Sequence, residues 1–303
     1  MANSDRGVAE RYAFLLRLSP AAGALALDFW RRRAELTIES KGPQDFVTRA
    51  DRAVEDFIRA EIARAFPGDG FLGEETVSSF AGTHERLWIV DPIDGTHNFL
   101  RGIPYWNVSI AYVERGERTL GAVFDPASGE LFHGRRGGGA WRRQIGGVAG
   151  VATAGSPGDR ATAAATPTVP TTPAASPAAD ARLTASAVDE LPGAVIAVGH
   201  HDRSPDYRYL AVRRELMDVN VAFRNFGCAA LQLAHVAEGR IDAYVELELS
   251  AWDAMAGMLL VDEAGGYTGP FPGPGGLTVR APVVASARGL GAPLARIVAA
   301  ATS

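Results

Sequence analysis

Apolar residues recur at helical spacing in the first part of the chain. Residues 7–33 carry them three and four positions apart and predict a helix, which Pro20 either kinks or divides into two. A second helix is predicted from Thr48 or Asp51 to Phe66, where Pro67 and Gly68 end the pattern. The chain therefore begins with helical structure on which other elements pack.

Short apolar runs replace the helical pattern after Gly68. They span residues 87–90, 108–113, 119–124 and 130–133, and turn residues such as Arg115 and Gly116 separate them. This spacing predicts an antiparallel meander that follows the two helices.

From Ala194 onward, strand-like and helix-like runs alternate. Strands are predicted at 194–198, 221–223, 241–245 and 283–285, and helices at 207–217, 229–237, 254–264 and 290–300. Alternation of this kind indicates a layered α/β half. We expect it to pack with the α+β half of residues 1–148 as one continuous layered body.

Residues 149–181 interrupt both patterns. The stretch is rich in Ala, Thr, Pro, Gly and Ser, and it contains no aromatic residue, Leu, Ile or Met. Such a segment buries too little apolar surface to offset its ordering entropy, so a disordered insert is predicted there. The C-terminal half then comprises residues 182–303.

The charge and the cysteine content exclude or disfavour several classes of function. The 303 residues include 30 basic and 35 acidic side chains, a net charge of −5, which disfavours a nucleic-acid or anionic-membrane partner. A single cysteine excludes an internal disulfide and a cysteine-based metal centre. No uninterrupted apolar run approaches the roughly 20 residues that span a bilayer, and we expect a cytoplasmic protein.

Two carboxylates follow the apolar strand residues 88–90. Pro92 fixes the backbone after Asp91, and Gly95 follows Asp94 and permits close approach of a ligand. Two carboxylates so near each other repel unless a hard cation such as Mg²⁺ lies between them. An ordinary surface turn is the alternative for the pair taken alone.

Two further acids stand in similar settings. Glu74 leaves an apolar strand through Gly73, although Gly-Glu-Glu by itself is typical of a solvated turn. Asp253 follows Trp252 at a predicted helix start, where a helix cap is the alternative to a metal ligand.

These three segments, together with residues 41–51 (KGPQDFVTRAD), resemble the inositol monophosphatase family in order and spacing. That family belongs to the lithium-sensitive, magnesium-dependent sugar-phosphatase superfamily. The resemblance runs from about Gly7 to the C-terminus, apart from residues 149–181. It implies an αβαβα layered sandwich and a homodimer.

The resemblance also implies metal ligands. Glu74, Asp91 and the backbone carbonyl of Ile93 would hold one Mg²⁺, and Asp91, Asp94 and Asp253 a second, with a third and weaker ion near Glu74. Four carboxylates around an anionic phosphate ester require such charge compensation.

In addition to Glu74, three residues resemble catalytic groups of the family. Thr96, with Asp51 behind it, matches the pair that orients and deprotonates the attacking water. Lys41, the only lysine in the chain, matches the motif lysine and would position Asp51 or screen the acidic site. A merely solvated lysine is the alternative.

The substrate side resembles the family less closely. Gly227, Cys228 and Ala229 match its Gly-Thr-Ala loop, with a cysteine in place of threonine, and the turn at Gly95 and Thr96 would receive the phosphate. Glu246 matches a glutamate that contacts inositol hydroxyls, and a carboxylate suits a polyol because it accepts hydroxyl hydrogens.

The resulting hypothesis is a Mg²⁺-dependent phosphomonoesterase that hydrolyses a small polyol or sugar phosphate. Inositol 1-phosphate is the first candidate. Histidinol phosphate, fructose 1,6-bisphosphate and 3′-phosphoadenosine 5′-phosphate are alternatives within the superfamily. A non-catalytic regulatory binding protein is the alternative of another class, and phosphate release with Mg²⁺ but not with EDTA separates the two.

Overall fold

The computed structural model of the chain describes residues 2–35, 38–42, 45–80, 84–145, 180–200 and 206–302. The insert predicted at residues 149–181 lies outside the described residues except for its last two, Asp180 and Ala181.

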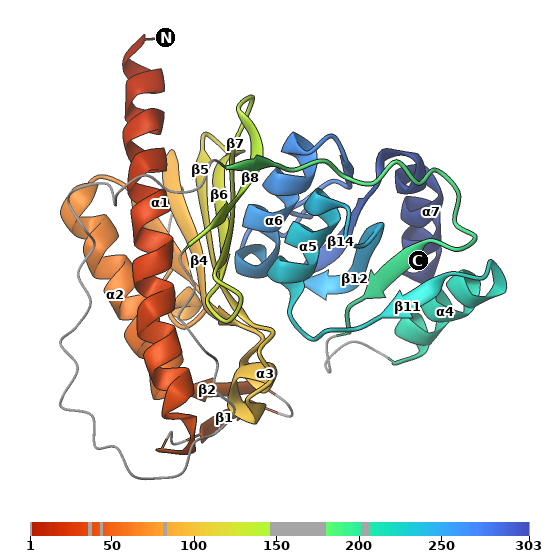
Figure 1. Cartoon of the computed structure of the whole chain (residues 1–303), viewed down its shortest axis with the longest axis horizontal. Helices are drawn as coiled ribbons and strands as arrows, with labels where there is room; N and C mark the ends of the chain where they lie inside the picture. Colours follow the sequence, from red (N-terminus) through yellow and green to blue (C-terminus); the bar gives the residue numbers. More distant parts are fainter. Residues whose placement is uncertain are drawn as a thin grey trace.

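One long helix, α1 (Ala2–Arg31), runs along the first sheet and contains Pro20 (Figure 1). The two-helix alternative at Pro20 is therefore wrong. Residues on both sides of the proline, such as Leu15 and Ala26, are fully buried, so the helix packs against the protein both before and after Pro20. Gly7–Arg31 is long and apolar enough to cross a membrane, but 61% of its most apolar window is buried in the protein, as in a core helix.

The first sheet has seven strands in the order β3-β4-β5-β6-β7-β8-β9. The predicted antiparallel meander is confirmed in β4 to β7, and β3 joins it parallel to β4. The sequence did not suggest β8, whose Gly139 and arginines obscure the strand pattern. The strands are β3 (Gly70–Gly73), β4 (Arg86–Asp94), β5 (Asn107–Glu114), β6 (Glu117–Asp125), β7 (Glu130–Arg135), β8 (Gly139–Gln144) and β9 (Ala181–Arg182).

The second sheet has five strands in the order β11-β10-β12-β14-β13. Strand β10 pairs parallel with β11 and β12, whereas β14 pairs antiparallel with β12 and β13. The strands are β10 (Val195–Val198), β11 (Ala222–Arg224), β12 (Ala243–Leu249), β13 (Tyr267–Thr268) and β14 (Ala281–Ser286); the helices of this half are α4 (Asp206–Asp218), α5 (Ala229–Glu238), α6 (Ala251–Glu263) and α7 (Gly291–Thr302).

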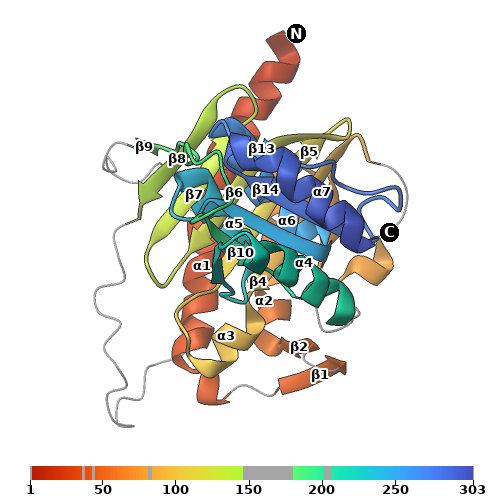
Figure 2. The same cartoon turned by 90° about the vertical axis from the view of Figure 1, so that its right-hand side faces the viewer.

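Five layers result, as predicted. Helices α1 and α2 (Arg49–Ala65) cover one face of the seven-stranded sheet, and α5 and α6 fill the space between the two sheets (Figure 1). Helices α4 and α7 cover the outer face of the five-stranded sheet (Figure 2). The short hairpin of β1 (Ile38–Gly42) and β2 (Asp45–Thr48) and the helix α3 (Thr96–Arg101) lie at one end of the sandwich.

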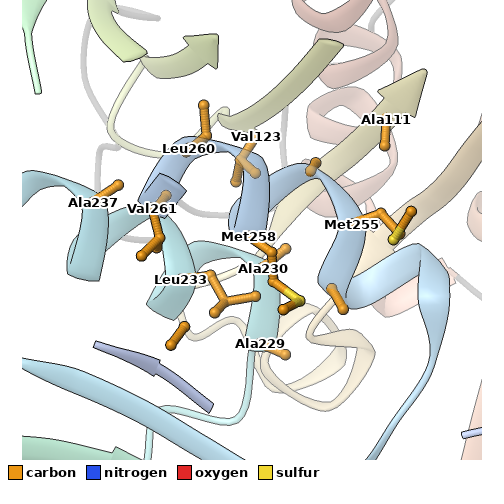
Figure 3. Packing of buried hydrophobic residues seen from close by; sticks show 14 of the residues in the cluster. Ala111, Val123, Ala229, Ala230, Leu233, Ala237, Met255, Met258, Leu260 and Val261 are labelled. Carbon is orange, nitrogen blue, oxygen red and sulfur yellow. The ribbon is translucent and has the colours of Figure 1, made fainter. Parts of the chain in front are cut away.

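Small residues let the central layer pack closely (Figure 3). A Cβ placed on Gly257 of α6 would lie 2.4 Å from the Leu233 side chain of α5. A Cβ on Gly121 of β6 would lie 2.8 Å from the Ala256 carbonyl. Only glycine permits both approaches, and this tight layer brings the N-termini of α5 and α6 to the end of β4.

Candidate active site

A bulge near the end of β4 places Asp91 and Asp94 on the same face of the sheet. Asp91 pairs with Ser109 of β5 and Asp94 with Asn107, so three steps on β4 match two on β5. In a regular strand, residues three apart point to opposite faces. The extra residue corrects this, and both carboxyls face α5 and α6.

Asp91 lies among other acids. Asp91, Asp94 and Asp253 each offer a carboxylate oxygen within 4.8 Å of the other two. Burial raises the pKa of Asp91 well above its usual range, and the charges of Glu74 and Asp253 raise it further. Burial and the charge of Asp94 likewise raise the pKa of Asp253 to about 7. The acids of the cluster therefore oppose one another's ionisation, and the charge of Arg280 offsets only part of the rise at Asp253.

Asp94, by contrast, is surrounded by hydrogen-bond donors. The first two N–H groups of α5 donate to it, Ala229 to Oδ1 at 3.2 Å and Ala230 to Oδ2 at 2.7 Å. Oδ2 also accepts from Asn107 Nδ2 at 2.8 Å and from Cys228 Sγ at 3.2 Å. Burial is the largest influence on the Asp94 pKa and raises it, while these bonds oppose the shift.

Asp253 lies in the first turn of α6. Ser250 is the N-cap, and the Asp253 carboxylate accepts from the Ser250 N–H, as in a capping box. The Ser250 hydroxyl instead accepts from Arg280 Nε at 3.1 Å. The N-cap alternative for Asp253 is therefore wrong, because α6 begins two residues earlier and Ser250 is its N-cap, while the Asp253 carboxyl belongs to the acidic cluster.

Thr96 and Asp51 meet beside the bulge. Thr96 Oγ1 lies 3.1 Å from the Ile93 carbonyl and 3.5 Å from Asp51 Oδ1, and Asp51 is 1% exposed at the start of α2. Gly95 adopts φ +90° as the N-cap of α3, and a Cβ there would lie 3.2 Å from the Tyr105 carbonyl. The predicted turn at Gly95 is confirmed, and it opens the short helix α3.

Glu246 faces the same layer from β12. It is 7% exposed, and its Oε2 accepts a short hydrogen bond from the hydroxyl of Tyr244, two residues earlier on the strand. Burial raises the pKa of Glu246 to about 8, and the charges of Asp253 and Asp94 act in the same direction. Glu246 is thus within electrostatic reach of the carboxyl cluster.

The structure brings together most of the residues that the sequence singled out. Gly227, Cys228 and Ala229 lie at the N-terminus of α5, but the Cys228 thiol is directed at Asp94. Burial raises the Cys228 pKa well above its usual range, so the thiol stays protonated. Lys41 belongs to β1, and its side chain lies outside the described part of the chain.

Three contributors escaped the sequence analysis. Asn107 binds Asp94, and Asn98 Nδ2 donates to the carbonyls of Tyr105 at 2.8 Å and Phe226 at 2.7 Å, which fixes the loop before Cys228. Glu55 is 1% exposed on the apolar face of α2. An acid at helical spacing among apolar residues was the one available signal.

The donor set suits a hard cation. Carboxylate oxygens are the preferred ligands of Mg²⁺, and the group of side chains that lies close enough together to hold an ion consists of three carboxylates. A divalent ion would supply the charge that the raised pKa values of Asp91, Asp94 and Asp253 show to be missing.

The chain is similar to known proteins over most of its length. The profile of the inositol monophosphatase family matches residues 8–302. An inositol-1-monophosphatase of Rhizobium meliloti is 38% identical over 259 residues, which are 84% of this chain and 83% of the relative, and a Nus factor SuhB of Xylella fastidiosa is 33% identical over 86% and 81%.

Solved structures show the same fold. The crystal structure of extragenic suppressor protein suhB from Bartonella henselae has a TM-score of 0.75 at 31% identity and covers 94% of this chain and 97% of its own. An IMPase of Thermotoga maritima has a TM-score of 0.72 at 27% identity and covers 100% and 98%.

The fold and its buried acidic site therefore define a metal-dependent phosphoric monoester hydrolase with a small phosphorylated substrate. The chain belongs to the inositol monophosphatase family.

Proposed function

We propose that this protein is a Mg²⁺-dependent phosphomonoesterase of a small polyol or sugar phosphate, with inositol 1-phosphate as the first candidate. The observation that carries the proposal is the buried cluster of Asp91, Asp94 and Asp253, whose oxygens lie within 4.8 Å of one another. Glu74 and the Ile93 carbonyl complete the donor set for two or three ions. A bound ion supplies charge that neutralises the phosphate and favours proton loss from the attacking water.

The residues beside the cluster divide the remaining work. Thr96 orients the water, and Asp51 behind it receives the proton, which its position 3.5 Å from the threonine hydroxyl supports. The N-terminus of α5 and the Gly95 turn bind the phosphate, and Lys41 offsets part of the acidic charge.

Glu246 binds hydroxyl groups of the leaving group. Because Tyr244 donates to Oε2, Oε1 is the oxygen available to a substrate hydroxyl. A polyol fits a carboxylate acceptor better than a nucleotide does. The inositol-1-monophosphatases among the relatives support the same substrate class.

A panel of phosphate esters tests the proposal. Phosphate release from inositol 1-phosphate, histidinol phosphate, fructose 1,6-bisphosphate and 3′-phosphoadenosine 5′-phosphate is compared by kcat/KM, with Mg²⁺ and with EDTA. Inositol 1-phosphate should have the highest value, and EDTA should abolish turnover. A higher kcat/KM for another ester would make that ester the preferred substrate, while the proposal of a Mg²⁺-dependent phosphatase would still stand.

Substitution of Glu246 sharpens the substrate assignment. Glu246→Gln should raise KM for inositol 1-phosphate about five- to thirtyfold, because a neutral amide is a weaker acceptor of the substrate hydroxyl, while kcat changes less. An aryl phosphate that lacks those hydroxyls is the control and should be hydrolysed equally by both proteins. Equal losses on both substrates would mean that Glu246 only supports the structure.

A regulatory protein is the second candidate, because several relatives are named Nus factor SuhB. The acidic cluster favours catalysis, and the absence of phosphate release under any metal condition would reverse this choice.

We also propose that the protein is a homodimer and acts in the cytoplasm. Light scattering would test the dimer.

A further inference from the structure

Glu55 is a buried acid to which the reaction assigns no task. It lies on α2 one turn after Asp51, on the face that also buries Ala50, Val54, Ile58 and Ile62. Burial is the largest influence on the Glu55 pKa and raises it, with a further rise from the charge of Glu75. An apolar side chain would continue this buried stripe at lower desolvation cost.

Both oxygens of Glu55 are bound by one short turn. Oε2 accepts from the backbone N–H of Glu75 at 2.8 Å, and Oε1 accepts from the hydroxyl of Thr76 at 2.7 Å. This turn follows directly after β3 and Glu74, where pairing with β4 has ended. The Glu55 carboxylate therefore supplies the hydrogen-bond acceptors that a neighbouring strand no longer provides.

Gly73 makes room for this contact. A Cβ on Gly73 would lie 2.3 Å from Glu55 Oε2 and 2.4 Å from its carboxyl carbon, so no larger residue fits without displacing the carboxylate. The absence of a side chain at Gly73 and the acid at Glu55 are two parts of one arrangement.

Glu74 is consequently fixed on both sides. Its own N–H donates to the Val90 carbonyl at 3.2 Å, and the next N–H, that of Glu75, donates to Glu55. The Glu74 charge acts on Asp91, where it is the largest influence on the pKa after burial. The backbone that directs Glu74 toward the carboxyl cluster is thus held by Val90 and Glu55.

We propose that Glu55 is a positioning residue, which orients Glu74 toward the metal-binding cluster by holding the Glu75–Thr76 turn. The inference rests on the proposed function, because it gives Glu74 a place among the metal ligands. Substitution of groups that hold a ligand in place typically costs ten- to hundredfold in metal affinity or activity.

Glutamine and methionine at position 55 separate positioning from charge. Glutamine removes the charge but reproduces both bonds: its oxygen accepts from the Glu75 N–H, and its amide donates to Thr76, whose hydroxyl can also accept. Methionine removes the charge and both bonds at similar volume. Asp56→Asn, an exposed acid on the same helix that pairs with Arg59, is the matched control.

The readouts are the Mg²⁺ dissociation constant of the substrate-free protein, by titration calorimetry, and kcat and KM at saturating Mg²⁺. Glu55→Gln and Asp56→Asn should stay within about threefold of wild type, and Glu55→Met should raise the dissociation constant about ten- to hundredfold. KM for inositol 1-phosphate should change less than twofold in all variants, because Glu246 remains.

Two results would overturn the inference while the proposed function stands. One is a Glu55→Met protein that binds Mg²⁺ as tightly as wild type. The other is a Glu55→Gln protein as impaired as Glu55→Met, which would assign the effect to charge. Should Glu55→Met fail to fold, Thr76→Val against Thr76→Ser repeats the test, with a loss expected only for valine. A wild-type protein that binds no Mg²⁺ would remove the proposed function and this inference together.

Discussion

Asp91 and Asp94 differ in the groups around them, although they are the same residue three positions apart on one strand. The neighbours of Asp91 include the acids Glu74 and Asp253, whose charges oppose its ionisation, and a single backbone donor, the Ile93 N–H at 2.9 Å from Oδ1. The neighbours of Asp94 are donors, the N-terminus of α5, Asn107 and Cys228, which favour it. Burial raises the pKa of both, but the neighbouring charges add to the rise at Asp91, whereas the neighbouring donors oppose it at Asp94.

The difference shows how the site combines stability with binding. The donors around Asp94 offset part of the cost of burying a carboxylate, so this residue fixes the frame of the site. The unbalanced charge around Asp91 makes the empty site unfavourable and leaves free energy to be gained when a cation binds.

Matched substitutions separate these two roles most strongly. Asp91→Asn and Asp94→Asn should each lower kcat more than about a hundredfold, because each removes an anionic metal ligand. In EDTA, the melting temperature should rise for Asp91→Asn, which relieves repulsion, and fall for Asp94→Asn, whose amide donor would face other donors at a cost of about 1–3 kcal/mol. Circular dichroism and phosphate release measure both effects.

Asp56→Asn is the control for the loss of one acidic residue and should change neither quantity. Equal shifts of melting temperature in the two variants would contradict the contrast between the two surroundings. If either variant keeps a kcat within threefold of wild type, the substituted residue is not a metal ligand.

Asn107→Ala tests the donor side alone. The substitution removes the 2.8 Å bond to Asp94 Oδ2 and should weaken Mg²⁺ binding about ten- to hundredfold, with a smaller effect on KM. Ser109→Ala is the control, since Ser109 lies two residues along the same strand and donates to the Trp252 carbonyl at 3.0 Å. Similar losses in both variants would point to general disturbance of β5.

The acidic side predicts an unusual pH dependence. The pKa of Asp253 is about 7 in the folded protein and roughly 3.9 in an unfolded chain. The native state therefore holds more protons between these values, and the free energy of unfolding falls as pH rises through this range. Glu246, with a pKa of about 8, extends the fall.

The titration of Asp253 alone should consequently lower the melting temperature of the metal-free protein by about 2–4 °C between pH 6 and pH 8, and Glu246 should add to this fall, as calorimetry in EDTA would measure. Saturating Mg²⁺ should abolish or reverse this slope, because the cation replaces the protons. A melting temperature that rises with pH in EDTA would show that the pKa values of Asp253 and Glu246 are not raised in the folded protein.

The sequence predicted the elements of the fold better than the contacts of the site. Local patterns sufficed for the meander, for the alternating C-terminal half and for the strand that ends at Asp91 and Asp94. Pro20 was misleading, since the apolar residues on both sides of it pack on one sheet and keep α1 continuous. The layer order followed from resemblance to a family and not from periodicity.

Contacts between distant residues were beyond sequence reasoning. The bulge that turns Asp91 and Asp94 to one face depends on how β4 pairs with β5. Asn107 opens an apolar strand and gave no sign of its bond to Asp94, and Cys228 was expected to contact substrate before its thiol was found against Asp94. Glu55 differs, because its place on an apolar helical face was visible and only its partners were not.

The bonds between Asp94 and the start of α5 have a consequence for synthesis of the chain. Asp94 and its partners Cys228, Ala229 and Ala230 are separated by 134 to 136 residues. A ribosome that adds about 5–20 residues per second makes them many seconds apart, so the β4 carboxylates wait for their partners. Until α5 emerges, Asp94 remains beside Asp91 with three of its four donors missing. The carboxyl cluster therefore receives most of the donors to Asp94 only after the start of α5 has been made, and a chain that stops before Cys228 lacks them.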